Sequence, residues 1–467
     1  MSNQILRLGK ETLIYGTSTV LARLLNFFLV PVYTHYLITS DYGIVATVFA
    51  FAALVNIVYQ YGMDQAYLRF AADSKEKDIF STPFLAVLGT AFIITAVVLV
   101  LSPYIAAGLG IGAQNAYLIQ IAAGVMAADC LNIVPFAKLR FDHRPWYYVM
   151  ARTASIIVNV AGNIIALAYF KTGLGGIFIA GILASLTALI LLLPVIKEDF
   201  VPRFNFKLFK EMFKFSWPFI PAGAASILVN VIDKPLLSHL AGLSNVGIYQ
   251  ANFKIGVFMM LIVVMFDQAW RPFFIQKAKQ EPKHKEIFAH VLTYFTALAT
   301  WALLILAFFT PALIQTPIAG KYFIHPDYWG GMDIIPLVLA GYLFYGFYIN
   351  FMVAPVLTKR TRVLMWVTLA GAAASVAANL LLVPRVGITG AGWAILISFI
   401  VMAGGLFIFL QKTYPIKYEY GKLALILICA AAAYTTAQTL PAQAAAVVIY
   451  PAIMWFIIRR SFNTNQA

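Results

Sequence analysis

Charged residues and cysteines are scarce in this sequence, and their scarcity excludes several classes of protein. Only 11% of the 467 residues are charged, whereas 62% are hydrophobic. Soluble domains carry roughly 25% charged residues, so a water-soluble globular domain is excluded. The two cysteines, Cys130 and Cys429, stand alone in separate apolar stretches. We therefore expect no disulfide between them, and packing is the default role of both.

Motifs for catalysis are also lacking. The sequence has no glycine-rich loop ending in Lys-Ser or Lys-Thr, and no Cys/His cluster at metal-ligand spacing. No segment between the apolar stretches is long enough to hold a catalytic domain. A membrane glycosyltransferase or polymerase is expected to carry its acidic residues in a larger external loop. We therefore expect a protein that is not an enzyme and that has no cofactor.

Long apolar runs are abundant. Stretches of about 20 residues, each long enough to cross a hydrocarbon core of ~30 Å as a helix, recur from end to end. Helices are expected because a chain inside the bilayer must satisfy its backbone hydrogen bonds without water. We predict an all-α polytopic membrane protein with about fourteen transmembrane helices. The predicted spans lie near 12–36, 41–63, 83–102, 115–137, 148–170, 174–196, 215–240, 245–268, 289–312, 332–357, 364–384, 388–411, 420–437 and 442–459.

The positions of lysine and arginine predict the orientation. With the N-terminus in the cytoplasm, nearly all of the 33 Lys and Arg residues fall in cytoplasmic segments or inside spans. Only Lys171, Lys321 and Arg385 fall on the opposite side. This asymmetry predicts that both termini are cytoplasmic. We expect the protein in the cytoplasmic (inner) membrane. Nucleic acid is not an expected partner, because the net charge of +15 is divided among short loops and does not form one surface.

An internal repeat divides the chain into two related halves. The string PVYTHYLITSDYGI, which begins at Pro31, returns as PLLSHLAGLSNVGI from Pro235. An even number of predicted spans separates the two copies, so both halves have the same orientation, as in transporters with parallel repeats. The linker between them is basic with interspersed phenylalanines and suits an amphipathic interfacial helix; the alternative is an ordinary charged loop. We predict a six-helix N-lobe, a cytoplasmic amphipathic linker, a six-helix C-lobe, and two extra helices with the C-terminus, at 1–196, 197–214, 215–411 and 412–467.

Ionisable and amide side chains inside the predicted spans are the candidate functional residues, because such groups are costly in lipid. Several recur at helical spacing and form polar stripes, such as Asn56, Gln60 and Asp64. Stripes from both halves are expected to face a shared, water-accessible interior. The candidates for substrate binding are Arg23, Asn26, Arg152, Asn159, Asn163, Asn230, Lys234, Gln250 and Lys254. The candidates for ion coupling or gating are Asp64, Asp129, Asp233 and Asp267.

Charged candidates near the predicted cytoplasmic boundary also have a structural explanation. Arg152 lies close enough to that boundary for its side chain to snorkel to the headgroups. Asp64 and Asp267 lie at the cytoplasmic ends of their helices. A capping role or an ion pair, with Arg69 and Arg271 respectively, explains these two carboxylates as well as a gate does.

Other candidates have an alternative role between helices. Asn26 and Asn230 are suited to interhelical hydrogen bonds, which is the commoner role of asparagine in membrane bundles. Asp233 beside Lys234 can form partners with other helices and stabilise the fold alone. Two cations lie too deep in the predicted spans for a simple structural explanation: Arg23 and Lys254.

Several short motifs recur in order along the chain. They are Ser40-Asp41-Tyr42-Gly43-Ile44, then Asp233-Lys234-Pro235 through Gly247-Ile248-Tyr249 with Ala251 and Lys254, and GITGAGWA at 387–394. In these motifs the chain resembles the multidrug/oligosaccharidyl-lipid/polysaccharide (MOP) exporter superfamily. It is similar in particular to the polysaccharide-transporter branch of lipid-linked oligosaccharide flippases (Wzx-type). Each motif is short, and the resemblance rests on their order and repetition over essentially the whole chain.

The resemblance implies a V-shaped, MATE-like pair of lobes and a transport function. It implies movement of undecaprenyl-diphosphate-linked oligosaccharide from the cytoplasmic to the periplasmic leaflet by alternating access. The product would serve export of cell-surface polysaccharide, such as the O-antigen of lipopolysaccharide. Basic candidates would bind the diphosphate, amides would bind sugar hydroxyls, and the acidic candidates would bind H⁺ or Na⁺ or only pair with cations. The implied partners are the polyprenyl-diphosphate-linked glycan, membrane lipids, and a glycan polymerase with other envelope assembly proteins.

Three alternatives remain open at this point. The nearest is a cation-coupled multidrug exporter of the same superfamily, which would favour an acidic, apolar pocket over deep basic residues. The others are a membrane glycosyltransferase or glycan ligase, and a scaffold for envelope assembly that transports nothing. Sugar transfer by the purified protein, and access of cysteine reagents from both sides of the membrane, would distinguish them.

Overall fold

The regular elements are helices throughout the part of the chain that the structure describes. The computed structural model describes residues 16, 20–72, 78–317 and 320–459. Among these residues, eleven helices are long and apolar enough to cross a membrane, or twelve if the bent pair Phe206–Ser216 and Phe219–Val231 forms one span. A shorter apolar helix, Tyr420–Thr436, and the first predicted span, which begins outside the described residues, account for the remaining two. The predicted class, an all-α polytopic membrane protein, is confirmed.

The chain separates into two compact units, Met1–Gln250 and Ala251–Ala467. The boundary between the two units falls inside a helix. It does not coincide with the boundary near residue 214 that the sequence repeat predicts between the lobes, and the predicted lobes stay a prediction. The elements of the first unit are α2 (Leu29–Tyr36), α3 (Thr39–Gln60), α4 (Met63–Ala71), α5 (Ser81–Gly108), η1 (Ala113–Asn115), α6 (Ala116–Phe141), α7 (Pro145–Ile164), η2 (Ile165–Tyr169), α8 (Leu174–Asp199), α9 (Phe206–Ser216), α10 (Phe219–Val231), α11 (Asp233–Ala241) and the first part of α12 (Leu243–Phe253).

The second unit continues with helices of similar length. Its elements are the end of α12, η3 (Lys254–Gly256), α13 (Val257–Gln280), α14 (His284–Gln315), η4 (Pro326–Ile334), α15 (Ile335–Phe351), α16 (Val353–Leu357), α17 (Arg362–Val386), α18 (Ile388–Thr413), α19 (Tyr420–Thr436) and α20 (Leu440–Arg459).

A helix break precedes both copies of the repeated string, three residues before the proline with which each copy begins. Residues 20–27 are helical, Phe28 interrupts the helix, and α2 contains Pro31; likewise α10 ends at Val231, Ile232 interrupts, and α11 contains Pro235. Proline has no N–H to donate to the carbonyl four residues earlier, and its ring crowds that carbonyl. The proline thus favours a break at this point, and the break is present in both halves.

The two copies of the repeat also touch each other at equivalent glycines, Gly43 on α3 and Gly247 on α12. A side-chain carbon on Gly43 would overlap the carbonyl oxygen of Leu243 and lie 3.2 Å from the backbone nitrogen of Gly247. A side-chain carbon on Gly247 would overlap the carbonyl oxygen of Thr39 and lie 3.1 Å from the backbone nitrogen of Gly43. The hydroxyls of Thr39 and Ser244 are 2.6 Å apart at the same crossing. Only residues without a side chain allow the two helices to approach this closely.

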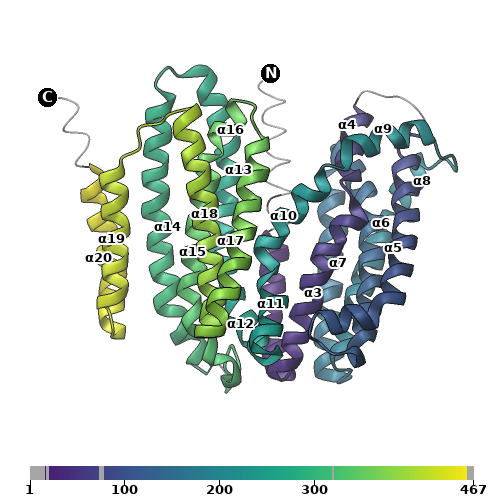
Figure 1. Cartoon of the computed structure of the whole chain (residues 1–467), viewed down its shortest axis with the longest axis horizontal. Coiled ribbons are helices and arrows are strands. Elements are labelled where there is room, and N and C mark those ends of the chain that lie inside the picture. The colour runs from purple at the N-terminus through teal and green to yellow at the C-terminus, as the bar shows by residue number, and fades with distance from the viewer. Residues whose placement is uncertain (1–15, 17–19, 73–77, 318–319, 460–467) are drawn as a thin grey trace. The chain divides into compact units, whose positions relative to one another are not determined.

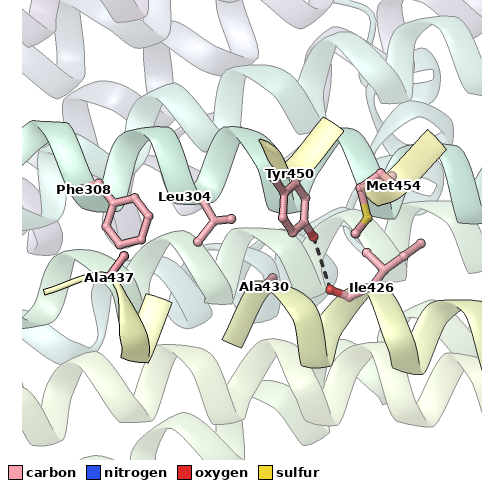
Figure 2. Close-up of a cluster of buried hydrophobic side chains, with 8 residues drawn as sticks. Leu304, Phe308, Ile426, Ala430, Ala437, Tyr450 and Met454 are labelled. Atoms are coloured by element: carbon pink, nitrogen blue, oxygen red, sulfur yellow. Dashed lines mark hydrogen bonds between the residues drawn. The ribbon is translucent and has the colours of Figure 1, made fainter. Parts of the chain in front are cut away.

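The two C-terminal helices, which the sequence predicts to be an addition to the repeat, pack on α14. Figure 2 shows the buried cluster where α14, α19 and α20 meet, with Leu304, Phe308, Ile426 and Met454 among its side chains. Tyr450 at its centre donates a hydrogen bond of 3.2 Å to the carbonyl of Ile426, and its hydroxyl lies 2.9 Å from that of Thr300. The pair is thus fixed to the second unit by apolar packing with a polar contact at its centre.

Candidate functional site

Two of the predicted binding residues, Asn159 and Asn163, belong to a hydrogen-bonded group between α7 and α2. The hydroxyl of Tyr33 donates to Oδ1 of Asn163 at 2.9 Å, and Nδ2 of Asn163 donates to the carbonyl oxygen of Asn159 at 2.7 Å. Asn163 is only 1% exposed, whereas Asn159 is partly exposed. The structure therefore brings these two candidates together, and the contacts of Asn163 join helices. Tyr33 was missed because only its place inside the repeated string marks it in the sequence.

A second group surrounds Asp129 on α6. Ser185 on α8 donates a hydrogen bond of 2.5 Å to Oδ1 of Asp129, and Nδ2 of Asn132 donates to the backbone carbonyl of Ser185 at 3.0 Å. Arg152 on α7 is exposed, interacts electrostatically with Asp129, and places its guanidinium carbon 5.9 Å from the centroid of the Phe136 ring. Asp129 and Arg152 thus belong to one cluster of three helices. Ser185 was missed because a single small hydroxyl in an apolar helix forms no stripe.

Asp64 follows a sharp break between α3 and α4. Tyr61 and Gly62 both adopt positive φ, at 32° and 71°. These two residues end α3 after Gln60, and α4 begins at Met63. The carboxylate of Asp64 accepts a hydrogen bond of 2.7 Å from Gln65 and forms an ion pair of 3.2 Å with Arg140 on α6. Asp64 therefore forms an ion pair, as the structural alternative proposed. Its partner is Arg140 on another helix, whereas the sequence suggested Arg69.

A buried charged group lies where α11 meets α12. The ammonium of Lys234 lies 2.9 Å from the carboxylate of Asp233 and donates to the carbonyl of Asn230 at 3.2 Å. The hydroxyl of Tyr249 donates to the other carboxylate oxygen of Asp233 at 2.6 Å. Asp233 and Lys234 are 2% and 5% exposed, and Gln250 next to Tyr249 is also buried. Such a buried pair compensates its own charge, which favours a role in the frame of the first unit.

The remaining candidates lie apart from these clusters. Asn26 is exposed and donates to the carbonyl of Ala22 at 2.9 Å within its own helix, and Arg23 is partly exposed. Lys254 opens the single 3₁₀ turn between α12 and α13 in the second unit and is partly exposed. Asp267 on α13 forms a 2.5 Å ion pair with Arg271, as the sequence alternative anticipated.

No metal site is found among the described residues. In that part of the chain, no group of three or more His, Cys, Asp or Glu side chains is placed to hold an ion. A cavity of about 670 Å³ in the second unit lies away from the candidate residues. Its walls are Tyr294, Ala297, Leu298, Trp301, Pro451, Met454, Trp455, Ile458 and Arg459.

Comparison with known proteins identifies a family and a fold. The sequence model of the family described as "Polysaccharide biosynthesis protein" matches residues 8–278. The fold is similar to that of the lipid II flippase MurJ in an inward closed conformation, with a TM-score of 0.76 and 16% identity over 96% of this chain and 99% of that chain.

Multidrug transporters share the fold at a greater distance. An inward-facing multidrug resistance MATE family transporter of the MOP superfamily matches with a TM-score of 0.65 and 11% identity, over 88% of this chain and 99% of its own. The Vibrio cholerae MATE transporter VcmN in the bent form matches with a TM-score of 0.58 and 13% identity, over 91% of this chain and 98% of its own. No curated protein matches the sequence.

Proposed function

The chain belongs to the polysaccharide biosynthesis protein family, and from this membership we propose that it is a flippase for a lipid-linked oligosaccharide. The proposed cargo is a polyprenyl-diphosphate-linked glycan, which moves from the cytoplasmic to the outer leaflet of the inner membrane by alternating access. The observation that carries the proposal is the similarity of its fold to that of the lipid II flippase MurJ, which extends over 96% of this chain, together with its family membership. Export of cell-surface polysaccharide would follow from this step.

The diphosphate of such a cargo needs cations that it can reach, because charge-assisted hydrogen bonds to phosphate require direct contact. Arg23, Arg152 and Lys254 are exposed or partly exposed, and we assign the diphosphate to them. Lys234 is buried against Asp233, and we assign it to the frame. The exposed or partly exposed amides would bind the sugar hydroxyls: Asn26, Asn159 and Asn230.

The acidic candidates divide by their partners. Asp64, Asp233 and Asp267 each lie within ion-pair distance of a cation. For Asp129 the described part of the chain shows a hydrogen bond from Ser185 and an electrostatic interaction with the exposed Arg152, but no ion pair. A carboxylate without a fixed cation is available to exchange H⁺ or Na⁺, so we propose Asp129 for ion coupling, and Asp64 with Asp267 for gating.

A proteoliposome assay tests the function. The purified protein is reconstituted with a polyprenyl-diphosphate oligosaccharide that carries a fluorophore on its glycan, and a membrane-impermeant reductant bleaches the outward-facing label. We expect protein-dependent loss of the inner-leaflet label, and strong reduction by Arg23→Ala. The matched control is Arg385→Ala, since Arg385 is exposed and, among the described residues, its guanidinium donates only to the carbonyl of Leu381 in its own helix.

Two results would contradict the proposal. If the wild-type protein leaves the inner-leaflet label untouched, the flippase function is wrong. If Arg23→Ala is fully active, the assignment of the diphosphate is wrong while the flippase function stands. An imposed proton or sodium gradient should change the rate for the wild-type protein and not for Asp129→Asn.

The similarity to MATE family transporters supports a second candidate, a cation-coupled multidrug exporter. The same proteoliposomes distinguish it. Gradient-driven movement of an organic cation, together with no translocation of the labelled glycan lipid, would favour the exporter.

A further inference from the structure

The short helix α9 lies across the end of the first unit, whereas α5, α6 and α8 run along that unit (Figure 1). Its side chains form three separate faces at helical spacing. Leu208, Met212 and Ser216 make the buried face. This face packs on α4 and α5, so the other two faces are directed away from the protein body.

Hydrogen bonds fix the start of α9 on the first unit. Ser81 at the beginning of α5 accepts a hydrogen bond of 2.7 Å from the backbone nitrogen of Val201, and Thr82 accepts one of 3.2 Å from that of Asn205. The side chain of Asn205 then caps the helix by accepting from the backbone nitrogen of Leu208 at 3.1 Å. The orientation of α9 about its own axis is therefore determined by the protein.

The second face is a row of phenylalanine rings. Phe206 is 69% exposed and Phe213 is 42% exposed. The ring of Phe209 lies between them, with centroids 6.3 Å from Phe206 and 5.8 Å from Phe213, and Phe204 extends the row at 5.5 Å from Phe209. A contiguous exposed aromatic row is unfavourable in water and favourable at the level of lipid headgroups and upper acyl chains.

The third face is basic: three lysines lie beside one exposed carboxylate, Glu211, which forms no ion pair with them. Lys207, Lys210 and Lys214 are all exposed, and within the described ranges none of them forms an ion pair. Two other cations of the unit, in contrast, have carboxylate partners. Lys138 lies 2.8 Å from the Asp142 carboxylate, and Arg144 bonds Glu198.

We propose that the basic face of α9 binds the headgroups of anionic phospholipids. An interfacial helix with an aromatic row on one flank and lysines beside it places the rings among acyl chains and the ammonium groups at phosphate level. Three uncompensated lysines match the charge of an anionic membrane surface. This inference does not depend on which cargo the protein carries.

Bound lipid would act on a defined part of the fold. The ring of Phe213 on α9 lies 6.0 Å from that of Tyr61. A side-chain carbon on Gly62 would contact the backbone oxygen of Ser216 at 3.1 Å and Cβ of Phe219 at 2.9 Å. The end of α9 therefore rests on the left-handed break between α3 and α4, which Asp64 follows. Anionic lipid on α9 stabilises this break in its present conformation.

Native mass spectrometry tests the proposal on the full-length protein in detergent. The protein is incubated with equal amounts of phosphatidylglycerol and phosphatidylcholine, and the bound lipids are counted. We expect preferential retention of phosphatidylglycerol by the wild-type protein. The combined variant Lys207→Gln, Lys210→Gln and Lys214→Gln should weaken this binding about fivefold per lysine, on the order of 100-fold in total.

Two further variants test whether the effect comes from the charge of α9. One keeps that charge with a different side chain, and the other removes the same amount of charge elsewhere. The combined Lys→Arg variant of the same three positions should retain phosphatidylglycerol. The matched control removes three exposed cations elsewhere, at Lys359, Arg360 and Arg362, and should also retain it. The proposal is overturned if the α9 Lys→Gln variant keeps the wild-type preference, if the control loses the lipid equally, or if the wild-type protein shows no preference.

Discussion

The contact between Gly43 and Gly247 leads to a prediction that depends on distances of single atoms. Alanine at either position places a methyl group on a backbone carbonyl, of Leu243 or of Thr39. Backbone atoms cannot rotate away as a side chain does, so α3 and α12 must separate by roughly 1–2 Å to restore an ordinary contact. We expect each substitution to destabilise the first unit.

The magnitude follows from three contributions. Overpacking of this kind costs about 1–3 kcal/mol, and loss of the 2.6 Å contact between Thr39 and Ser244 costs about 0.5–1.5 kcal/mol. Alanine recovers about 0.5–1 kcal/mol because it favours the helix over glycine. The net expectation is a loss of about 1–3 kcal/mol for each substitution. Since one separation of the helices relieves both overlaps, the double variant should cost clearly less than the sum of the two.

Reaction of Cys130 with a thiol dye during heating gives the measurement. Cys130 is fully buried in the first unit, so in a Cys429→Ala background its labelling reports unfolding of that unit. The matched control is Gly89→Ala in α5, where no atom lies within 4 Å of the added carbon; this variant should be neutral or slightly stabilised. Wild-type stability for Gly43→Ala, or full additivity in the double variant, would refute the reasoning.

Three more predictions concern other contacts. Lys234→Met leaves the buried Asp233 carboxylate uncompensated and should lower the free energy of unfolding by about 3–5 kcal/mol, measured by the same thiol dye. Adding Asp233→Asn should recover much of this loss. A double variant as unstable as Lys234→Met would contradict the reasoning. Tyr450→Phe should lower the melting temperature by an amount equivalent to about 1 kcal/mol, and an unchanged value would show that its hydroxyl contributes nothing. Burial raises the pKa of Glu419, but hydrogen bonds from Lys422 and a threonine outweigh it and hold that pKa below the usual 4.5. Because the folded pKa is the lower one, the stabilisation is present above 4.5 and is lost as the pH falls through the folded value; melting of Glu419→Gln should be less sensitive to acid in that range.

The fold class was predictable because its signal is long and redundant. Each span repeats the apolar signal over many residues, so errors at single positions do not change the result. The breaks at Phe28 and Ile232 have a local explanation in Pro31 and Pro235, because the loss of the proline N–H acts on neighbouring residues. Local chemistry of this kind can be inferred from sequence.

The partners of the polar residues were not predictable from stripes alone. A stripe at helical spacing gives a face of one helix, but the neighbour of that face is set by packing between helices. Arg140 was therefore not recognised as the partner of Asp64, and Ser185 not as the donor to Asp129. Asp267 with Arg271 was anticipated, because that ion pair joins residues one turn apart on the same helix.

The contact between Gly43 and Gly247 bears on how such a chain arose. Gly43 meets Leu243, and Gly247 meets Thr39. Each glycine thus faces the residue that lies one helical turn before the other glycine, and these two residues are counterparts in the repeat. Reciprocal contacts of this kind define an isologous interface between two identical subunits. In an ancestral homodimer, one substitution at this glycine would have disturbed the contact from both sides at once. In a single chain the two positions can change independently, so each half can carry its own charges while the crossing of the two helices remains.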